Sequence, residues 1–417
     1  MVWDGKRWCP DQTGEVVRKA KQTAASIYQE AALAAQHQGQ DAAKAVAKWA
    51  ARSHQVERIN AMLRMAESEP GIPVTPEELD REHWLLNVLN GTIDLRTGQL
   101  MDRQRDHLIT KLAPVKYEAE ARCPKFFRFL RRIMDGNPHL IKFLRQAIGY
   151  SLTGDISEQV LFVFWGAGAN GKSTLMNLVM KILGDYSKKA PGELLMAKRG
   201  EVHPTEKTIL HGARLVAAIE TEEGRRLSET VVKELTGGDP VTARRMREDF
   251  WTFDPTHKLF LITNYRPQIT ASNEAMWRRV LLLPFEVIIP ESERDKSLAE
   301  ALLEEGPGIL AWAVRGCLRW QRNGLYIPPE IRQATAEYRE EMDMLADFLE
   351  ERCILEPSAT IRVRDFYLAY RDWAEATGED GMGKITFGNR LRERGFSQDR
   401  NHEMGRYWVG VRLSDQD

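Results

Sequence analysis

The chain has 417 residues, enough for two or three domains, and the composition of an ordinary globular protein. No apolar run is long enough for a membrane span, and the N-terminus lacks the apolar core of a signal peptide. The net charge is −1, so any contact with nucleic acid must come from local basic clusters. The four cysteines form no Cys-x-x-Cys pair, which argues against a zinc site and favours a reducing, cytoplasmic location.

The N-terminal part, residues 1–150, is predicted to be a mainly helical domain. Residues 1 to about 70 are rich in Ala, Gln, Glu, Lys and Arg, which favour helix, and Trp3, Trp8 and Val17 are expected to anchor one end. Residues 84–100 differ in composition from the helical segment, and their apolar and glycine residues predict two or three short strands joined by glycine turns.

Residues 124–152 are predicted to be helical again. Four apolar side chains are expected on one buried face: Phe126, Phe127, Leu130 and Ile133. Basic side chains fall mostly on the other face, and a solvated helix surface is favoured there over a DNA contact.

Residues 151–345 are predicted to form an α/β domain with a mostly parallel sheet. Short apolar runs separated by helical or looped segments give this pattern. The expected strands are Leu161–Trp165, Leu215–Ile219, Leu259–Thr263 and Val280–Pro284.

A phosphate-binding loop is predicted directly after the first of these strands. Gly166 to Ser173 fits G-x-x-x-x-G-K-[ST], with an apolar run before it and an apolar-periodic helix after it. Glycines let backbone N–H groups converge on an anion, the lysine reaches the β- and γ-phosphates, and the serine hydroxyl can bind Mg²⁺. The nucleotide-binding residues are expected to be Gly166, Gly168, Asn170, Gly171, Lys172, Ser173 and Thr174. A chance match is the less favoured interpretation, because the flanking segments supply the required context.

Acidic residues follow the second apolar strand. A Mg²⁺–ATP site needs a carboxylate at such a strand end to hold the metal and another to orient the attacking water. Glu220, Glu222 and Glu223 are the candidates, and the sequence does not decide between their roles. A solvated acidic loop is the alternative interpretation.

Two further positions complete the predicted catalytic set. Asn264 ends the third strand, where an amide can polarise the attacking water or contact the γ-phosphate. Arg278 and Arg279 precede the fourth strand, and one of them would reach the γ-phosphate of a neighbouring subunit. The sequence supports equally well an alternative in which these arginines are only a surface pair or form a salt bridge at the sheet edge.

A basic hairpin is predicted between the second and third strands. Val241–Met246 and Phe250–Phe253 can pair, and the chain places basic side chains near the tip, with aromatic residues beside them. Basic and aromatic side chains together favour binding to the phosphodiester backbone and bases of a nucleic acid. The expected DNA-binding residues are Arg244, Arg245, Arg247 and Lys258, and pairing with nearby acidic residues is the alternative.

Residues 346–417 are predicted to be a separate small domain. Ile361–Ala376 and Lys384–Arg394 are expected to be helices, followed by a hairpin that ends in RYWVGVRL. Two helices followed by a β-hairpin favour a winged helix.

With these motifs in place, the chain resembles a superfamily 3 helicase of the phage and plasmid primase–helicase group, related to the poxvirus-type primase–helicases. The resemblance rests on WLLNVLNGTIDLRTGQL, FWGAGANGKSTL, ETEEGRRLSETVVKELTGGDPVTARRMREDF, PTHKLFLITNYRP, EAMWRRVLLLPF and the tail GRYWVGVRL. These segments extend over almost the whole chain.

The resemblance implies an AAA+-like ring, commonly a hexamer, that hydrolyses ATP with Mg²⁺ between subunits and moves on single-stranded or forked DNA, usually 3′ to 5′. It makes Lys172 and Ser173 the Walker A pair, Glu220 with Glu222 the Walker B region, and Asn264 sensor 1. It makes Arg278 or Arg279 the arginine finger, without deciding between them.

Larger relatives carry a primase domain before the region where this chain begins, and no acidic metal-binding set of that kind is present here. We therefore expect no primer synthesis by this chain alone. Either a separate primase or polymerase is a partner, or this chain is a fragment of a longer protein. The expected function is that of an ATP-dependent DNA helicase acting in the replication of a phage, plasmid or mobile element. Two alternatives stay open: a replication initiator whose DNA binding is controlled by ATP, and a P-loop remodelling motor that does not unwind DNA.

Overall fold

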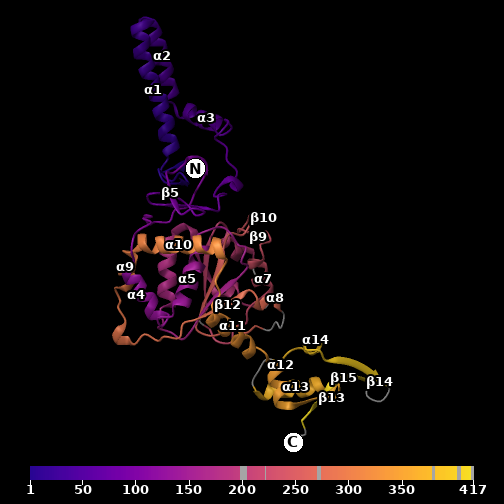
Figure 1. Cartoon of the computed structure of the whole chain (residues 1–417). Coiled ribbons are helices and arrows are strands. Elements are labelled where there is room, and N and C mark those ends of the chain that lie inside the picture. The colour runs from indigo at the N-terminus through magenta and orange to yellow at the C-terminus, as the bar shows by residue number, and fades with distance from the viewer. Residues whose placement is uncertain (198–203, 221, 270–273, 378–380, 402–404, 415–417) are drawn as a thin grey trace.

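The computed structural model describes residues 1–197, 204–220, 222–269, 274–377, 381–401 and 405–414. Along the chain it contains a set of N-terminal helices, a central α/β body and a C-terminal module (Figure 1). The predicted mixed α/β architecture with a parallel sheet is confirmed.

The central sheet has five parallel strands in the order β12-β6-β11-β8-β7. The four predicted strands are present, and β8 includes Glu220 as its last residue. Their bounds are β6 Leu161–Trp165, β8 Leu215–Glu220, β11 Lys258–Thr263 and β12 Val280–Pro284. The sequence did not predict the edge strand β7, Ser187–Pro191, because it carries two exposed lysines instead of an apolar run.

Helices cover both faces of this sheet, which is why its inner strands are apolar throughout. Phe162 and Phe164 of β6 pack into one hydrophobic cluster, while Leu161 and Val163 pack into another on the opposite face. The helices of the body are α4 Pro124–Ile133, α5 Pro138–Tyr150, α6 Lys172–Leu183, α7 Glu229–Gly237, α8 Glu274–Trp277, α9 Leu298–Leu303, α10 Gly306–Asn323 and α11 Pro329–Glu341. Short 3-10 turns are η1 Pro76–Glu78, η2 Arg105–His107, η3 Gly184–Tyr186, η4 Gly192–Leu194, η5 Pro204–Leu210 and η6 Glu291–Glu293.

One hydrophobic cluster crosses residue 150, where the sequence placed a domain boundary. Leu86, Phe126 and Leu144 belong to the same cluster as Phe162 and Leu175. Helix α4 buries Phe126, Phe129, Leu130 and Ile133. The expected buried position of Phe127 is wrong, since this side chain is 39% exposed and Phe129 takes its place.

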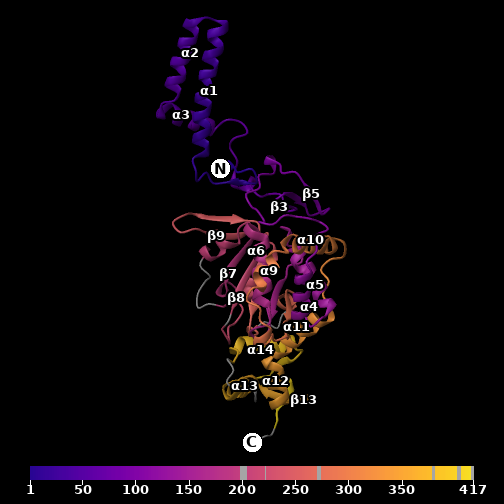
Figure 2. The same ribbon diagram turned by 90° about the vertical axis from the view of Figure 1, so that its left-hand side faces the viewer.

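The N-terminal helices extend away from the body. Helices α1 (Glu15–His37) and α2 (Gln40–Ser53) run side by side, and α3 (Val56–Ala66) packs near their base (Figures 1 and 2). The prediction of helix from residue 1 is wrong for the first residues, which form the short antiparallel pair β1 (Val2–Trp3) and β2 (Trp8–Cys9). Glycines at positions 5 and 14 adopt positive φ there and favour a turn and a helix start over a continuous helix.

Trp3 and Trp8 lie at this end as expected, whereas the predicted anchor Val17 is 37% exposed. The rings of Trp3 and Trp8 lie 5.8 Å apart, and the Trp8 indole N–H donates to the Arg105 carbonyl. Residues 84–101 form the predicted antiparallel sheet, with strands β3 Leu85–Val88, β4 Gly91–Asp94 and β5 Gln99–Met101.

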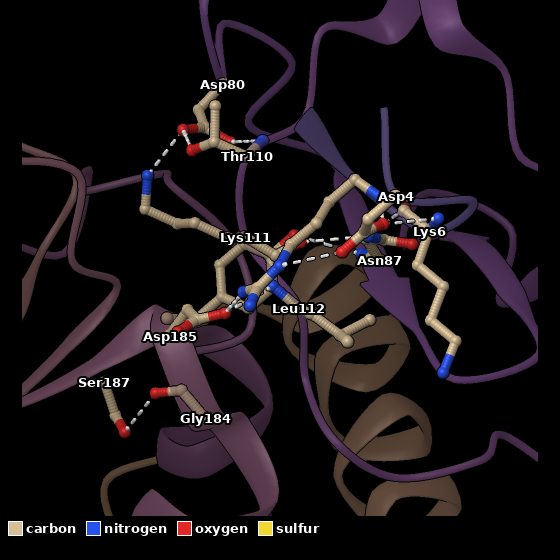
Figure 3. A network of polar contacts seen from close by, with 12 residues as sticks. Asp4, Lys6, Asp80, Asn87, Thr110, Lys111, Leu112, Gly184, Asp185 and Ser187 are labelled. Carbon is tan, nitrogen blue, oxygen red and sulfur yellow. Dashed lines mark hydrogen bonds and ion pairs between the residues drawn. The ribbon is translucent and has the colours of Figure 1, made fainter. Parts of the chain in front are cut away.

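A polar network joins the N-terminal segment to the end of α6 (Figure 3). Asp185, in the turn after α6, accepts hydrogen bonds from the Arg7 guanidinium and from the Leu112 N–H. Asp80 accepts from Lys111 at 2.6 Å and also from Thr110. These bonds hold the segment before the N-terminal helices against the turn that follows α6.

The C-terminal module has its own hydrophobic cluster. It contains α12 Met344–Arg352, β13 Cys353–Arg362, α13 Val363–Thr377, α14 Lys384–Glu393, β14 Ser397–Asn401 and β15 Gly405–Leu413. The two predicted helices and the hairpin are present, and the sheet order is β13-β15-β14. Strand β13 was not predicted, because most of its side chains are exposed and Pro357 interrupts its apolar residues. In the described part of the chain, no helix is long and apolar enough to cross a membrane.

Candidate nucleotide-binding site

The predicted phosphate-binding loop connects β6 to α6. Gly166 has φ 151° and Gly171 has φ 86°, backbone conformations that favour glycine. A Cβ on Gly166 would lie 2.2 Å from the Phe285 carbonyl oxygen, and one on Gly171 would lie 2.5 Å from Ile133. A Cβ on Gly168 would meet no atom within 4 Å, and this part of the loop is exposed. Packing therefore requires two of the three glycines, and the third leaves the outer face of the loop open.

The Lys172 ammonium lies inside this loop. It donates to the carbonyl oxygens of Gly166 and Ala167, the latter at 3.1 Å, and to Asn170 Oδ1 at 3.0 Å. Lys172 is 3% exposed, and this burial lowers the pKa of its ammonium to about 8. Oxygen dipoles stabilise the ammonium charge. Within the described residues, the hydrogen-bond partners of Lys172 include no carboxylate. An anion at the loop would supply the missing countercharge.

Asn170 fixes the shape of the loop. Its side-chain amide donates to the Ala167 carbonyl and, at 3.1 Å, to the Phe285 carbonyl at the end of β12. The Ala169 carbonyl accepts from the Ile289 N–H at 2.8 Å. The segment after β12 is thus part of the site, although only its apolar run LLLPF marked it in the sequence. Ser173 is exposed and Thr174 is half-buried at the start of α6.

The acidic candidates lie at the same edge of the sheet. Glu220 is directly opposite Thr263 of β11, which is opposite Trp165 of β6, so the three strands end in one row. Glu220 is 6% exposed, whereas Glu222 and Glu223 are exposed. Glu220 Oε1 accepts the Glu222 backbone N–H at 2.9 Å.

Arg225 was not singled out in the sequence, yet it lies against these carboxylates. Its Nε lies 3.8 Å from Glu220 Oε2 and 3.4 Å from Glu222 Oε2. Spacing alone gave no signal for this contact, because it depends on a turn that the sequence did not predict.

Asn264 directly follows β11 and is half-buried at the same edge. Next to it, Arg266 lies over the Trp165 ring at 4.0 Å and pairs with Glu341 of α11. Arg266 was also missed. It packs α11 against the end of β6 and so supports the start of the loop.

The two arginines before β12 differ in their surroundings. Arg279 is 8% exposed, and its guanidinium donates to Thr236 Oγ1 at 3.2 Å and to the Ala275 carbonyl. Burial, and then the neighbouring Arg278 charge, lower the pKa of the Arg279 guanidinium. Arg278 is exposed. Both precede β12, so they lie at the edge of the sheet opposite the loop.

The predicted basic hairpin is present as β9 (Val241–Arg244) and β10 (Phe250–Phe253). Arg244 lies 5.2 Å from the Phe250 ring centre and donates to the Glu248 carbonyl. Arg245 lies near the Trp251 ring and 3.8 Å from the Glu248 carboxylate. Arg247 at the tip is exposed and has φ 64°. Phe250 is 58% exposed, so one face of the hairpin combines cations with an accessible aromatic ring.

Lys258 does not belong to this exposed group, which corrects its assignment to a DNA contact. It is 3% exposed, and its ammonium donates to the carbonyls of Thr153, Asp155 and Thr256. Burial lowers the pKa of Lys258 well below its usual range. Two of these carbonyls lie in the turn after α5, and the third lies two residues before the lysine itself.

The residues present fit a nucleoside triphosphate with Mg²⁺. The loop offers a caged ammonium, an open face and the first N–H groups of α6, which suit a phosphate chain. The Ser173 hydroxyl and the Glu220 carboxylate are oxygen donors of the kind that Mg²⁺ prefers.

Three family models match the chain. Residues 1–135 match the D5 N terminal like family, residues 164–279 match a family of unknown function, and residues 340–404 match the Poxvirus D5 protein-like family. The two D5 matches lie at the two ends of the chain, on either side of the loop described above.

Viral proteins are similar to most of the chain. "Putative helicase L207/L206" of Acanthamoeba polyphaga mimivirus is 28% identical over 71% of this chain and 33% of its own length. "Putative helicase 022R" of Frog virus 3 is 27% identical over 57% of this chain and 26% of its own. "Putative primase C962R" of African swine fever virus (isolate Tick/Malawi/Lil 20-1/1983) is 24% identical over 71% and 34%. The chain thus spans about a third of the length of these relatives.

Among solved structures, the apo structure of the NrS-1 C-terminal region is similar with a TM-score of 0.45 and 14% identity, over 72% of this chain and 78% of that one. The fold and the family matches define the class as an α/β protein related to viral helicases and primases. The chain is therefore similar to D5-like primase–helicases at both of its ends.

Proposed function

We propose that this protein is an ATP-dependent DNA helicase of the superfamily 3 type that works as a ring in the replication of a virus, phage or other mobile element. The observation that carries the proposal is the caged Lys172 ammonium at the start of α6, with Glu220 and Asn264 at the same edge of the sheet. Relatives named as helicases support the assignment to DNA unwinding over other uses of ATP.

The roles follow from position. Lys172 and the N–H groups of α6 would bind the β- and γ-phosphates, and Asn170 would keep the loop in the shape that this requires. Ser173 and Glu220 would hold Mg²⁺, which when bound neutralises phosphate charge. Glu222 or Glu223 would orient the attacking water together with Asn264. Glu220 is the better metal candidate of the three acids, because it ends β8 and is fixed by the Glu222 N–H.

The arginine pair supports hydrolysis between subunits. Arg278 is exposed and lies before β12, whereas the loop lies after it. Five strand residues separate the two edges by about 16 Å at ~3.3 Å per residue. Arg278 therefore cannot serve the loop of its own subunit, and a catalytic role requires a neighbouring copy. Arg279 is held inside its own chain, which makes Arg278 the better candidate for the finger.

The β9–β10 hairpin is the proposed contact to single-stranded DNA. Arg244, Arg245 and Arg247 supply charge for phosphates, and Phe250 supplies an exposed ring for base stacking. The hairpin joins α7, which follows Glu220, to β11, which ends before Asn264. A shift of Glu220 during nucleotide turnover would therefore reach the hairpin through α7, and a shift of Asn264 would reach it through β11.

Unwinding of a labelled forked DNA with ATP and Mg²⁺ tests the proposal, beside a Lys172→Ala variant. Strand separation that is lost in the variant supports the helicase. ATP hydrolysis that DNA stimulates without strand separation would favour the initiator or the remodelling motor. No hydrolysis by assembled protein on any DNA would rule out the enzymatic function.

A further inference from the structure

Two packed helices of the body, α5 and α10, carry basic side chains and no acidic ones. The sequences of both helices lack Asp and Glu, although the whole chain has a net charge of −1. Their lysine and arginine side chains define what we call the α5–α10 surface: Lys142, Arg145, Arg315, Arg319 and Arg322. An uncompensated excess of positive charge on two neighbouring elements is typical of a surface that binds a polyanion.

The three arginines of α10 lie in one row along the helix. Arg315, Arg319 and Arg322 follow one another at spacings of four and three residues, which places them on the same face, and all three are exposed. Arg315 donates to the Ala119 carbonyl at 2.8 Å. Within the residues that the structure describes, Arg319 and Arg322 form no ion pair. Their charges are therefore available to a ligand.

Arg145 of α5 joins this row where the two helices touch. A Cβ on Gly316 would lie 2.0 Å from the Arg145 carbonyl oxygen and 2.9 Å from its Cγ, so the Arg145 side chain starts directly against the turn that carries Arg315 and Arg319. Its Nε is buried and has no hydrogen-bond partner in the described part of the chain. Burial, and then the charges of Arg319 and Arg315, lower the pKa of the Arg145 guanidinium. These cations repel one another in the free protein, and a bound anion would offset that repulsion.

The length of the row fits a chain of phosphate groups better than a single anion. Seven residues of helix separate Arg315 from Arg322, which is about 10 Å along the axis at ~1.5 Å per residue. Two aromatic side chains beside the row are already engaged within the protein: Trp320 is buried, and the Lys142 ammonium lies 3.8 Å from the centre of the Tyr326 ring. Contacts would therefore go to the phosphodiester backbone, which carries no sequence information.

The α5–α10 surface lies on the other side of the body from the β9–β10 hairpin. Phe143 of α5 and Trp312 of α10 pack into the hydrophobic cluster on one face of the central sheet, whereas Val241 and Phe253 of the hairpin pack into the cluster on the opposite face. Figure 2 shows the hairpin and α10 on opposite sides of the body. A DNA strand held by the hairpin would thus leave the α5–α10 surface open to a different strand.

We propose that the α5–α10 surface binds the phosphate backbone of the DNA strand that the β9–β10 hairpin does not hold. At a fork, one strand would pass the hairpin while the basic helices guide the other along the outside of the body. This inference rests on the proposed function only in assigning the first strand to the hairpin, and the binding itself needs no ATP.

Equilibrium binding of the full chain to two labelled DNAs, without nucleotide and at several salt concentrations, tests the proposal. One DNA is a fork with two single-stranded arms, and the other is a short single strand that the hairpin alone can hold. The test variant is Arg319→Gln with Arg322→Gln. The matched control is Lys188→Gln with Lys189→Gln, which removes two exposed charges from the edge strand β7.

We expect the test variant to lose affinity for the fork by about tenfold or more, while its affinity for the short single strand changes little. The slope of log K against log salt for the fork should become shallower by about one to two, because two phosphate contacts are lost. The control variant should bind both DNAs like the unmodified chain. Because no ATP is present, these results do not depend on whether the protein unwinds DNA.

Two further measurements separate charge from folding. The test variant should unfold at an equal or higher temperature, since it removes repulsion around Arg145. Arg319→Lys with Arg322→Lys keeps the charges and should retain most of the fork affinity and its salt slope. Unchanged fork affinity in the glutamine variant would overturn the proposal and favour an acidic protein partner for this surface. Equal losses on the fork and the single strand, or equal losses in the lysine and glutamine variants, would also overturn it.

Discussion

The Lys172 ammonium lies 3.0 Å from the amide oxygen of Asn170, whose amide nitrogen in turn donates to Phe285 at 3.1 Å. One asparagine thus joins the lysine that would bind phosphate to the end of a neighbouring strand. Asn170 also fixes the conformation of the loop without nucleotide, and in that conformation oxygen atoms stabilise the buried Lys172 ammonium.

The pH dependence of nucleotide binding should report Lys172. Its pKa of about 8 in the free protein is lowered by burial, and bound phosphates would raise it. Below about pH 8 the ammonium is already charged, so affinity should be flat. Above that pH binding must take up a proton, and affinity should fall by up to about tenfold per pH unit.

Titration calorimetry between pH 7.5 and 9.5, in buffers of different ionisation enthalpy, measures both the affinity and the proton uptake. Lys172→Arg keeps its charge over this range and should show no such decline, even if it binds more weakly. A wild-type affinity that stays constant up to pH 9.5 would contradict the assignment of Lys172 to the phosphates.

Replacing Asn170 by Ala should weaken nucleotide binding without removing any charge. The variant leaves the buried Phe285 carbonyl without its donor, which should lower the free energy of unfolding by about 1–3 kcal/mol. We expect nucleotide affinity to fall by about tenfold or more, because the loop and Lys172 lose their fixed position. Asn177→Ala on the exposed side of α6 is the matched control. Equal affinities for the two variants would show that Asn170 has no positioning role.

Much of the central fold could be predicted because burial leaves a clear pattern. Strands β6, β8, β11 and β12 are covered on both faces, so their sequences are continuous apolar runs. Strand β7 lies at the sheet edge and β13 is mostly exposed, so neither carries that pattern. The loop could be predicted because its backbone needs glycine at fixed positions.

What the sequence could not show was which charged side chains are buried. Lys258 follows the basic hairpin along the chain, and only the fold turns it inward toward the carbonyls beyond α5. Arg278 and Arg279 are adjacent and chemically identical, and the direction in which each leaves the chain separates an exposed group from a buried one. The contact of Arg225 with Glu220 also depends on tertiary structure.

The exposed ring of Phe250 should matter for DNA and little for folding. Phe250→Ala should lower single-strand affinity by about 1–3 kcal/mol, the typical contribution of base stacking, with a small change in thermal stability. Lys258→Ala should do the reverse, since it removes a buried cation that three carbonyls hold. Fluorescence anisotropy with a labelled oligonucleotide and thermal unfolding measure the two effects. A stable Phe250→Ala variant with full affinity would remove the β9–β10 hairpin from the DNA path.

The two arginines before β12 should separate stability from catalysis. Arg279→Ala removes hydrogen bonds to Thr236 and Ala275 and should lower the free energy of unfolding by about 1–3 kcal/mol. Arg278→Ala should leave stability and nucleotide binding unchanged and abolish hydrolysis in the assembled protein.

Mixing the Arg278→Ala and Lys172→Ala proteins then tests action between subunits. Each is expected to be inactive alone. In a random ring of both, about a quarter of the interfaces pair an intact loop with an intact arginine, so part of the activity should return. Recovered hydrolysis would place Arg278 at the loop of the next subunit, as its position at the opposite edge of the sheet requires. If the mixture stays inactive although the two proteins assemble together, Arg278 is not the finger, and the exposed pair at this edge has only a surface role.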